Sequence, residues 1–205
     1  MPEQVTVFFD YLCPFSWRAA ELADLAASEL GLGFRWHHFS LMQNNSEDPD
    51  YQIWNEQLNS EDPSGTGGLY PFLASLAARR QGDDAGERFR LELLRARHRD
   101  HRQLTPGTIA RVVDCTGLDA QRFESDLQDP ELRTRLAQDH HRARCLRVFG
   151  TPIFRFEDSE DSGYLRISEV PRDAGEAVRL FTVFREVLTE FPYLETIRRP
   201  RSNGN

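Results

Sequence analysis

The sequence predicts an α/β fold that is divided by an all-helical insertion. Three observations predict it: a strand–helix–strand pattern at the N-terminus, helical periodicity across most of the middle, and a return to strand-like sequence near residue 150. Strands joined through a helix are parallel, with a right-handed crossover. We therefore expect the first part of the α/β domain over residues 1–42, a loop and helical insertion over 43–145, and the second part over 146–205.

The N-terminal unit has clear boundaries in the sequence. Residues 5–10 are short, β-branched and aromatic, which is typical of a buried strand. Residues 14–30 place apolar side chains on one helical face, and Gly31 ends the run. Residues 33–39 alternate in the manner of a second strand.

The middle of the chain begins with a polar connection. Residues 42–68 are rich in Asn, Asp, Ser, Pro and Gly, and we expect an irregular segment with a short helix near residues 51–58 and a turn at 65–68. Five helices follow. The first runs from Leu69 until Gly82, the second spans 84–99, the third starts with Thr105 and Pro106 and stops at Gly117, the fourth follows Asp119, and the fifth starts at Asp129-Pro130.

The last part of the chain returns to strands and ends in a helix. Residues 150–156 predict a strand preceded by an X-Pro bond, and acidic residues 157–163 predict a hairpin-like turn. Residues 164–170 are a further strand candidate. A helical stripe of apolar side chains over 177–188 predicts a final helix.

Composition excludes several classes of function. The chain has 205 residues and a net charge of −8, which argues against nucleic acid as a partner. It contains no lysine, so a P-loop and Schiff-base catalysis on a side-chain amine are excluded. Three widely spaced cysteines do not form a disulfide framework. With no apolar run long enough for a membrane helix and no basic leader, we expect a cytoplasmic protein without a membrane partner.

Cys13 carries the strongest chemical signal. It follows the first strand directly, and Pro14 suits the first position of the helix after it. A helix N-terminus favours a thiolate, and such sites lower the pKa of a cysteine from ~8.5 to roughly 3.5–7.5. The alternative is a small buried apolar residue, the usual role of a free cysteine. Ser16 stands where a Cys-x-x-Cys pair would have its second sulfur; it can donate a hydrogen bond to a thiolate but cannot close a disulfide.

These motifs resemble a known group. Cys13-Pro14-Phe15-Ser16-Trp17 after the first strand, with Gly150-Thr151-Pro152 after the helical block, is similar to the DsbA/FrnE-like branch of the thioredoxin superfamily. Within it, the chain resembles thiol-dependent nitroreductases of actinobacteria, whose motif reads Cys-Pro-Trp-Cys-Trp, and more distantly kappa-class glutathione transferases and 2-hydroxychromene-2-carboxylate isomerases. The resemblance extends to residues 39–41, 168–171 and 191–193.

The resemblance implies a thioredoxin-like fold and a thiol-dependent oxidoreductase. It implies that Cys13 is the nucleophile beside a cis Thr151–Pro152 bond, whose preceding backbone pairs with the incoming substrate; an ordinary trans proline is the alternative. Without a second cysteine in the motif, a small thiol (glutathione, mycothiol or bacillithiol) would resolve the adduct, and no tightly bound cofactor is implied. The other partner would be a small-molecule or protein disulfide, and the sequence does not indicate an oligomeric state.

Two other functions remain open at the sequence level. In a transferase or isomerase, the co-substrate thiol would be the nucleophile, with Ser16 or Cys13 activating it. In a redox sensor, Cys13 would form a stable mixed disulfide. Phe15 and Trp17 are expected to line the substrate pocket, although a core role for Trp17 is equally open.

The remaining polar residues have weaker signals. Asp10 is expected to cap the end of the strand, with proton relay as the alternative. Cys145 is a distant candidate for resolving Cys13, and Cys115 is expected in the core. Adjacent histidines on a strand or helix do not point the same way, so the pairs at 37–38 and 140–141 predict no metal site.

Overall fold

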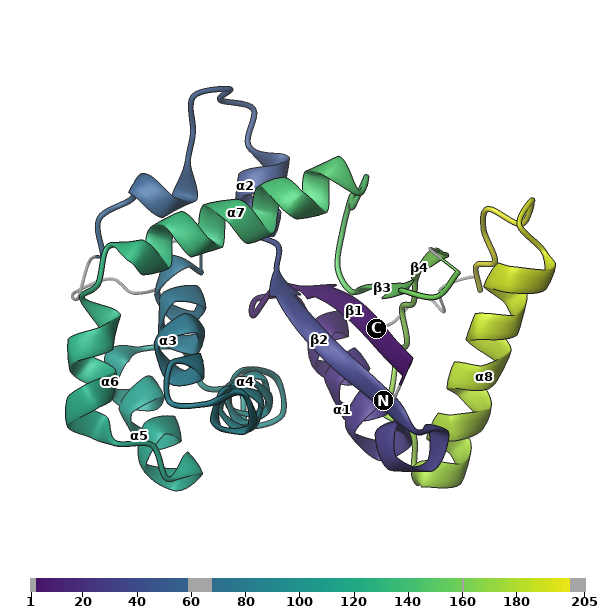
Figure 1. The fold of residues 1–205 in the computed structure, drawn as a ribbon, viewed down its shortest axis with the longest axis horizontal. Coiled ribbons are helices and arrows are strands. Elements are labelled where there is room, and N and C mark those ends of the chain that lie inside the picture. The colour runs from purple at the N-terminus through teal and green to yellow at the C-terminus, as the bar shows by residue number, and fades with distance from the viewer. Residues whose placement is uncertain (1–2, 59–67, 160, 200–205) are drawn as a thin grey trace, which may run out of the picture.

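A computed structural model describes residues 3–58, 68–159 and 161–199 (Figure 1). A small twisted sheet lies between helices, and a block of helices adjoins one side of it. The expected α/β fold with a helical insertion is confirmed. No helix in the described ranges combines the length and apolar character that a bilayer crossing requires.

The sheet has the strand order β2-β1-β3-β4 in the described residues. The first two strands, β1 (Glu3–Phe9) and β2 (Leu32–His38), are parallel, as the crossover through a helix requires. The other two, β3 (Ile153–Phe156) and β4 (Ser162–Tyr164), form an antiparallel hairpin, and β3 pairs antiparallel with β1. Chain segments about 150 residues apart therefore meet at the centre of the sheet, and both carry motif residues at their ends.

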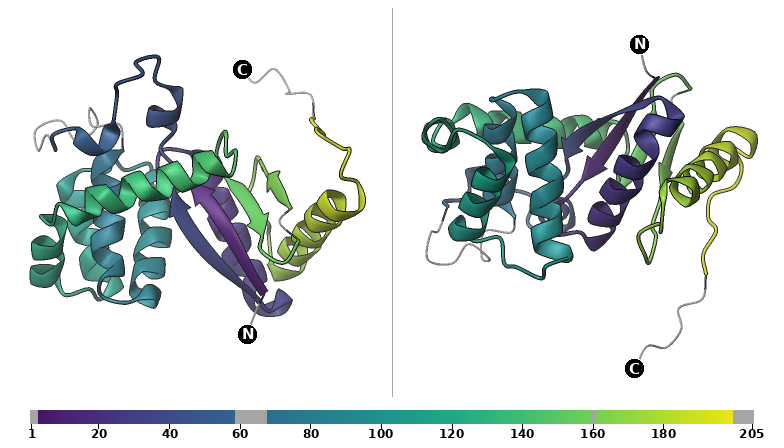
Figure 2. Two further views of the ribbon diagram at one scale, coloured as in Figure 1. Left: turned by 45° about the horizontal axis from the view of Figure 1, so that its top comes forward. Right: turned by 90° about the horizontal axis from the view of Figure 1, so that it is seen from below.

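Helices cover both faces of the sheet (Figure 2). On one face, α1 (Pro14–Leu30) packs against α8 (Ala174–Glu190), and on the other lies α7 (Glu131–Cys145). Side chains of a strand alternate between the two faces, so β1 contributes to both cores. Val7 belongs to the larger cluster, with residues of α8, whereas Phe8 belongs to the smaller one, with residues of α7.

The helical block contains α3 (Leu69–Arg79), α4 (Asp83–His98), α5 (Pro106–Thr116) and α6 (Ala120–Leu127). The expected positions of these helices are confirmed within one or two residues, and two of them, α5 and α6, have side-chain caps at their N-termini. The Thr105 hydroxyl accepts a hydrogen bond from Thr108 N, and the Asp119 carboxylate accepts one from Arg122 N. The last helix of the insertion, α7, starts one residue later than expected, with Pro130 at its N-cap.

The polar connection after β2 is more ordered at its start than expected. It begins with a short helix, α2 (Leu41–Asn45), because the Ser40 hydroxyl accepts a hydrogen bond from Gln43 N and caps its first turn. Near the expected short helix lies a single 3-10 turn, η1 (Ile53–Asn55). Most of the turn expected at 65–68 lies outside the described residues.

The strand expected over residues 164–170 is wrong. The strand is β4, which ends at Tyr164 and forms only three residue pairs with β3. Its position depends on α8 rather than on its own pattern: a Cβ atom at Gly163 would lie 2.7 Å from side-chain atoms of Phe184 and Leu188. Glycine lets the hairpin approach the helix, and the following residues leave the sheet.

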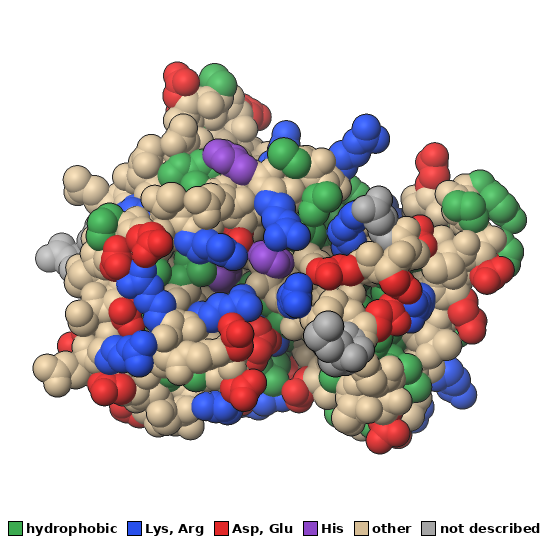
Figure 3. Space-filling model, in the orientation of Figure 1, with side chains coloured by type: hydrophobic (Ala, Val, Ile, Leu, Met, Phe, Trp, Pro, Cys, Tyr) green, Lys and Arg blue, Asp and Glu red, His purple; other side chains and the backbone are tan. Residues whose placement is uncertain are grey.

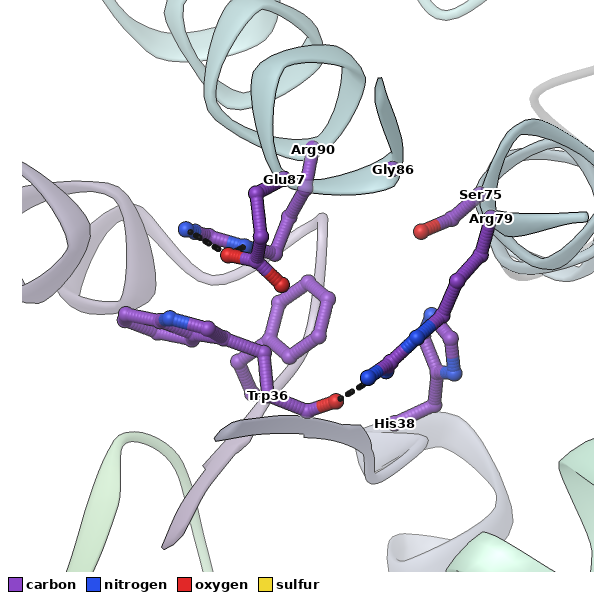
Figure 4. A pocket seen from close by; sticks show the side chains of 8 residues that line it. Trp36, His38, Ser75, Arg79, Gly86, Glu87 and Arg90 are labelled. Atoms are coloured by element: carbon purple, nitrogen blue, oxygen red, sulfur yellow. Dashed lines mark hydrogen bonds and ion pairs between the residues drawn. The ribbon is translucent and has the colours of Figure 1, made fainter. Parts of the chain in front are cut away.

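The insertion meets the sheet around a small polar cavity (Figure 4). The guanidinium of Arg90 from α4 lies 3.8 Å from the ring centre of Trp36 on β2 and is paired with Glu87 at 2.8 Å. Arg79 from α3 donates to the carbonyl of Trp36. The cavity has a volume of about 10 Å³, which is room for about one water molecule. The cavity therefore marks the place where α3 and α4 pack against β2.

Candidate active site

Cys13 lies where the sequence motif places it, at the N-cap of α1 with Pro14 in the first turn. Its backbone is held on both sides. Cys13 N donates to Asp10 O at 3.1 Å, and Cys13 O accepts from Ser16 N at 3.0 Å. Both bonds close the turn between β1 and α1. The strand, the turn and the helix therefore determine the position of the sulfur together.

The cis-proline segment lies directly beside this sulfur. The Thr151–Pro152 peptide bond is cis, and Cys13 Sγ donates a hydrogen bond to Thr151 O at 3.3 Å. Cys13 is 5% exposed, yet Leu12 before it is 40% exposed, and Cys13 belongs to neither hydrophobic cluster of the described residues. The thiol is thus buried at the end of β1, next to the carbonyl of Thr151, while the residue before it reaches the surface.

Ser16 is fully buried, and its described side-chain hydrogen bond is not with the cysteine. The hydroxyl oxygen accepts from Asp10 N at 3.2 Å. This bond joins the first turn of α1 to the end of β1. A cysteine at this position would form a weaker bond here, since sulfur is a poor acceptor. Ser16 therefore stabilises the loop that carries Cys13.

The buried Asp10 carboxylate stabilises the same loop through hydrogen bonds. It accepts hydrogen bonds from Leu12 N and Leu41 N, both at 2.7 Å, so it connects the loop before Cys13 with the segment after β2. Burial raises the pKa of Asp10 to about 6, against the two backbone hydrogen bonds. These bonds agree with the expected cap at the end of the strand, and the proton relay remains an untested alternative.

His98, at the end of α4, holds the loop from the side of the insertion. Its Nε2 lies 2.8 Å from Tyr11 O, and its ring stacks on Trp17 with centroids 6.2 Å apart. Burial lowers the pKa of His98 to about 4 against the hydrogen bond to Tyr11 O, and the nearby Arg97 and Arg18 act in the same direction as burial. At neutral pH the ring is uncharged, and its Nε2–H donates to Tyr11 O. The sequence analysis missed this contact, because the two residues are 87 positions apart.

We expect His98→Leu, which removes the Nε2–H donor, to destabilise the protein by about 1 kcal/mol at neutral pH, the net worth of a typical hydrogen bond. A histidine with a lowered folded pKa stabilises the fold at neutral pH, and this contribution is lost as pH falls from about 6.5 toward 4. Urea unfolding of wild type and variant at pH 7.5 and 4.5 measures it. The wild-type advantage should shrink at pH 4.5. An advantage that is equal at both pH values would contradict the role of His98.

The two aromatic residues of the motif have different surroundings. Trp17 packs against the larger hydrophobic cluster, and its Nε1 donates to Glu21 at 2.9 Å, so its contacts are those of a partly buried core residue. Phe15 is half-buried, and the guanidinium of Arg166 lies over its ring. Both rings have a guanidinium over them, but the cation is much closer to Phe15, with Arg166 at 3.7 Å from its ring centre, than to Trp17, with Arg18 at 5.9 Å.

The histidine pair at the end of β2 behaves differently from the expectation that adjacent rings diverge. His37 Nδ1 and His38 Nδ1 lie 3.1 and 3.2 Å from the two carboxylate oxygens of Asp139 on α7. Burial acts to raise the pKa of Asp139, but the hydrogen bonds from both histidines outweigh it and hold the pKa below its usual range. For His38, burial outweighs the carboxylate and lowers the pKa. The cluster joins β2 to α7.

The other two cysteines lie apart from the motif. Cys145 is exposed at the end of α7, and nothing in the described contacts joins it to Cys13. The expected core position of Cys115 is wrong. It is exposed on α5, because the buried face of this helix is formed by other residues: Thr108, Ile109, Val112, Val113 and Thr116.

A larger cavity, of about 330 Å³, lies between the segment after β2 and α7. Polar side chains line it, among them Gln43, Asn44 and Arg144, and Arg144 donates to Asn44. His140 stacks on Phe39 at its inner end, and burial lowers the pKa of this histidine to about 4. In the described residues, no group of three or more His, Cys, Asp or Glu side chains is arranged to hold a metal ion.

The chain belongs to the DSBA-like thioredoxin domain family, which matches residues 4–62 and 69–171. The match includes Cys13, Ser16 and the Thr151–Pro152 segment, so the resemblance in the motifs is confirmed at the level of this family. No curated protein matches the chain.

Solved structures have the same fold at low sequence identity. The cytosolic disulfide reductase DsbM from Pseudomonas aeruginosa is 20% identical with a TM-score of 0.60, covering 89% of this chain and 98% of its own. A 2-hydroxychromene-2-carboxylate isomerase is 16% identical with a TM-score of 0.61, covering 94% and 100%. A probable DsbA oxidoreductase from Streptomyces coelicolor is 15% identical with a TM-score of 0.60, covering 98% and 94%.

Proposed function

We propose that this protein is a thiol–disulfide oxidoreductase that works with the single cysteine Cys13 and a small thiol as co-substrate. The observation that carries the proposal is the contact of Cys13 Sγ with the carbonyl of Thr151, before a cis-proline, at the start of α1. The family of the chain supports the class of chemistry, and Ser16 in place of a second cysteine supports the single-cysteine cycle.

The cycle needs two exchange steps. The Cys13 thiol loses its proton, and the thiolate attacks one sulfur of a disulfide; a bond forms between the two sulfurs, and the other half of the disulfide leaves as a thiolate. A small thiolate then attacks the substrate sulfur of the mixed disulfide. This step releases the Cys13 thiolate and yields a new disulfide between substrate and small thiol. Each step exchanges one sulfur–sulfur bond for another, so no further oxidant or reductant is needed.

The motif residues would contact the incoming disulfide, and the cell compartment would supply the small thiol. Phe15 and the backbone at Thr151 and Pro152 would contact the incoming disulfide, with Pro14 keeping the start of α1 in position. Glutathione, mycothiol or bacillithiol would serve as the small thiol, in the reducing cytoplasm where three free cysteines are compatible with function. Placement in the FrnE-like branch belongs to the same proposal.

A second candidate is an isomerase or transferase that activates a small thiol without using Cys13 as nucleophile. The specific observation in its favour is the serine at position 16, together with a fold similar to that of the 2-hydroxychromene-2-carboxylate isomerase. In this case the thiol of the co-substrate, bound near Cys13, attacks the substrate. The two candidates differ in whether a covalent adduct on Cys13 forms during turnover.

Reaction of the reduced protein with glutathione disulfide tests the proposal. We expect mass spectrometry to find one glutathione on the peptide that contains Cys13, formed at least about tenfold faster than on Cys145, although Cys145 is the more exposed thiol. Excess glutathione should then release the adduct and restore the free Cys13 thiol. Exposed Cys115 serves as an internal reference for a thiol without activation, since burial of its sulfur and the nearby Glu92 raise its pKa.

Three results would contradict the proposal. If Cys115 and Cys145 react while Cys13 stays free, Cys13 is not a nucleophile. An adduct on Cys13 that no small thiol removes indicates a sensor. If the protein turns over a substrate with a small thiol and no adduct on Cys13 is detected at any time, the isomerase or transferase is favoured.

A further inference from the structure

Two arginines share the aromatic ring of Phe15, two residues after the reactive cysteine. The guanidinium carbon of Arg166 lies 3.7 Å from the ring centre, and that of Arg18 lies 5.3 Å from it. Arg18 is also 5.9 Å from the ring of Trp17. Contacts at these distances are attractive for each cation by itself. They place two positive charges around one side chain of the Cys-Pro-Phe-Ser motif.

The two arginines come from different parts of the chain. Arg18 is three residues after Phe15 on α1, so both lie on the same side of the helix. Arg166 is in the segment after β4, and Arg18 donates a hydrogen bond from Nη1 to the carbonyl of Ile167 at 3.4 Å. This bond fixes the segment against the first turns of α1. The fold therefore brings the two guanidinium groups together from separate parts of the chain.

Neither charge is neutralised within the described part of the chain. Other arginines contact several carboxylates: Arg80 contacts Asp126, Asp129 and Glu131, and Arg95 contacts Glu21, Asp24 and Glu92. Figure 3 shows such interleaved positive and negative side chains over the helical block. Arg18 and Arg166 form no ion pair with a described residue, in a protein whose net charge is −8.

We infer that Arg18 and Arg166 form a binding subsite for the carboxylate of the small thiol that attacks the mixed disulfide on Cys13. The inference rests on the proposed function. Two like charges around one ring repel each other, and a carboxylate between or beside them removes this repulsion through charge-assisted hydrogen bonds. The carbon chain of the ligand would contact Phe15. The preferred co-substrate is thus a thiol that carries at least one carboxylate, in preference to a neutral or cationic thiol.

A charge series of small thiols tests this subsite. The mixed disulfide of Cys13 is prepared, and its reduction by mercaptopropionate, mercaptoethanol and cysteamine is followed by stopped-flow or quenched alkylation. Each rate is divided by the rate for the same thiol on a free low-molecular-weight disulfide, because thiols differ in intrinsic nucleophilicity. We expect the corrected rate for the anionic thiol to exceed that for the neutral thiol roughly tenfold, with a smaller excess at high salt.

Arg166→Ala and Arg18→Ala should each remove most of this preference while leaving the neutral thiol within about twofold of wild type. Arg166→Ala is the cleaner variant, since Arg18 also bonds Ile167 O. Arg111→Ala is the matched control, because Arg111 is exposed on α5 and bonds only the carbonyl of Gly107 in its own helix among the described contacts. It should keep the preference unchanged.

The outcomes separate the subsite from the proposed function. Reduction by the neutral thiol without any preference for the anionic one overturns the subsite and leaves the oxidoreductase intact. Equal slowing of all three thiols in both variants also overturns the subsite, since it assigns a structural role to the arginines. A mixed disulfide that none of the thiols reduces overturns both proposals.

Discussion

Replacement of Cys13 with serine is expected to lower thiol–disulfide exchange by at least about 10³-fold. A serine hydroxyl is a poor nucleophile at neutral pH without a neighbouring base, whereas a cysteine thiol ionises readily. The substitution is nearly isosteric, and the hydroxyl can keep a hydrogen bond to Thr151 O, so the loss should not come from unfolding. Reduction of a fluorogenic small disulfide by glutathione measures the rate, with circular dichroism as the check on folding.

Matched variants make this result specific. Cys115→Ser removes an exposed thiol on α5 and should keep the full rate. Cys145→Ser tests the distant possibility of a resolving cysteine, which would appear as a slower second step in the absence of added thiol. If Cys13→Ser retained full turnover, Cys13 would not be the nucleophile, and the isomerase or transferase would be the better assignment.

Asp139→Ala is expected to destabilise the fold by about 3–5 kcal/mol, the range for removing one partner of a buried polar or ionic cluster. The carboxylate is the common acceptor for His37 and His38, and both Nδ1 atoms would lose their partner in a buried site. The aspartate is the one residue of the cluster on α7, so the helix would lose its polar anchor on β2. For a chain of this size, the melting temperature should fall by about 2–4 °C for each kcal/mol.

The stability that Asp139 contributes is expected to decrease as the pH is lowered. Since the folded pKa of Asp139 is below its usual range, its contribution is present above about pH 4 and is lost as pH falls further. His37 and His38 face it from β2, and Arg135 from its own helix lies 3.5 Å away. Urea unfolding at several pH values compares wild type with Asp139→Ala and with Asp114→Ala, an exposed control on α5. Equal stability of wild type and Asp139→Ala at pH 7 would contradict the role of the cluster.

Much of the fold could be predicted because its signals are local. The cap residues Thr105 and Asp119, with Gly117 as a stop, determine helix ends through bonds within one turn. Cys13 and Pro14 mark the junction of strand and helix in the same way. Pro152 could be paired with Cys13 only through the resemblance to a family, because nothing in the spacing of the two motifs indicates a contact across 138 residues.

The features that the sequence did not reveal depend on distant partners. The histidines of β2 meet Asp139 from more than 100 residues away, and the strand pattern alone suggests diverging rings. The close approach of β4 to α8 at Gly163 is a tertiary contact, which a three-residue segment does not encode. The contacts of Asp10 and His98 that support the loop before Cys13 are likewise tertiary. Their signal in the sequence is a single carboxylate and a histidine in a basic helix, neither of which has a recognisable motif.

The contact between His98 and the carbonyl of Tyr11 has a consequence for engineering. A shortened chain, made by excising the helical block, is expected to lose the arrangement of the loop before Cys13, because the carbonyl of Tyr11 loses its hydrogen-bond donor. Transfer of Cys13-Pro14-Phe15-Ser16 alone into another protein would leave out this donor as well. The helical block and the loop before Cys13 therefore depend on each other, and we expect a substitution that removes the His98 ring to loosen the loop that carries this sulfur.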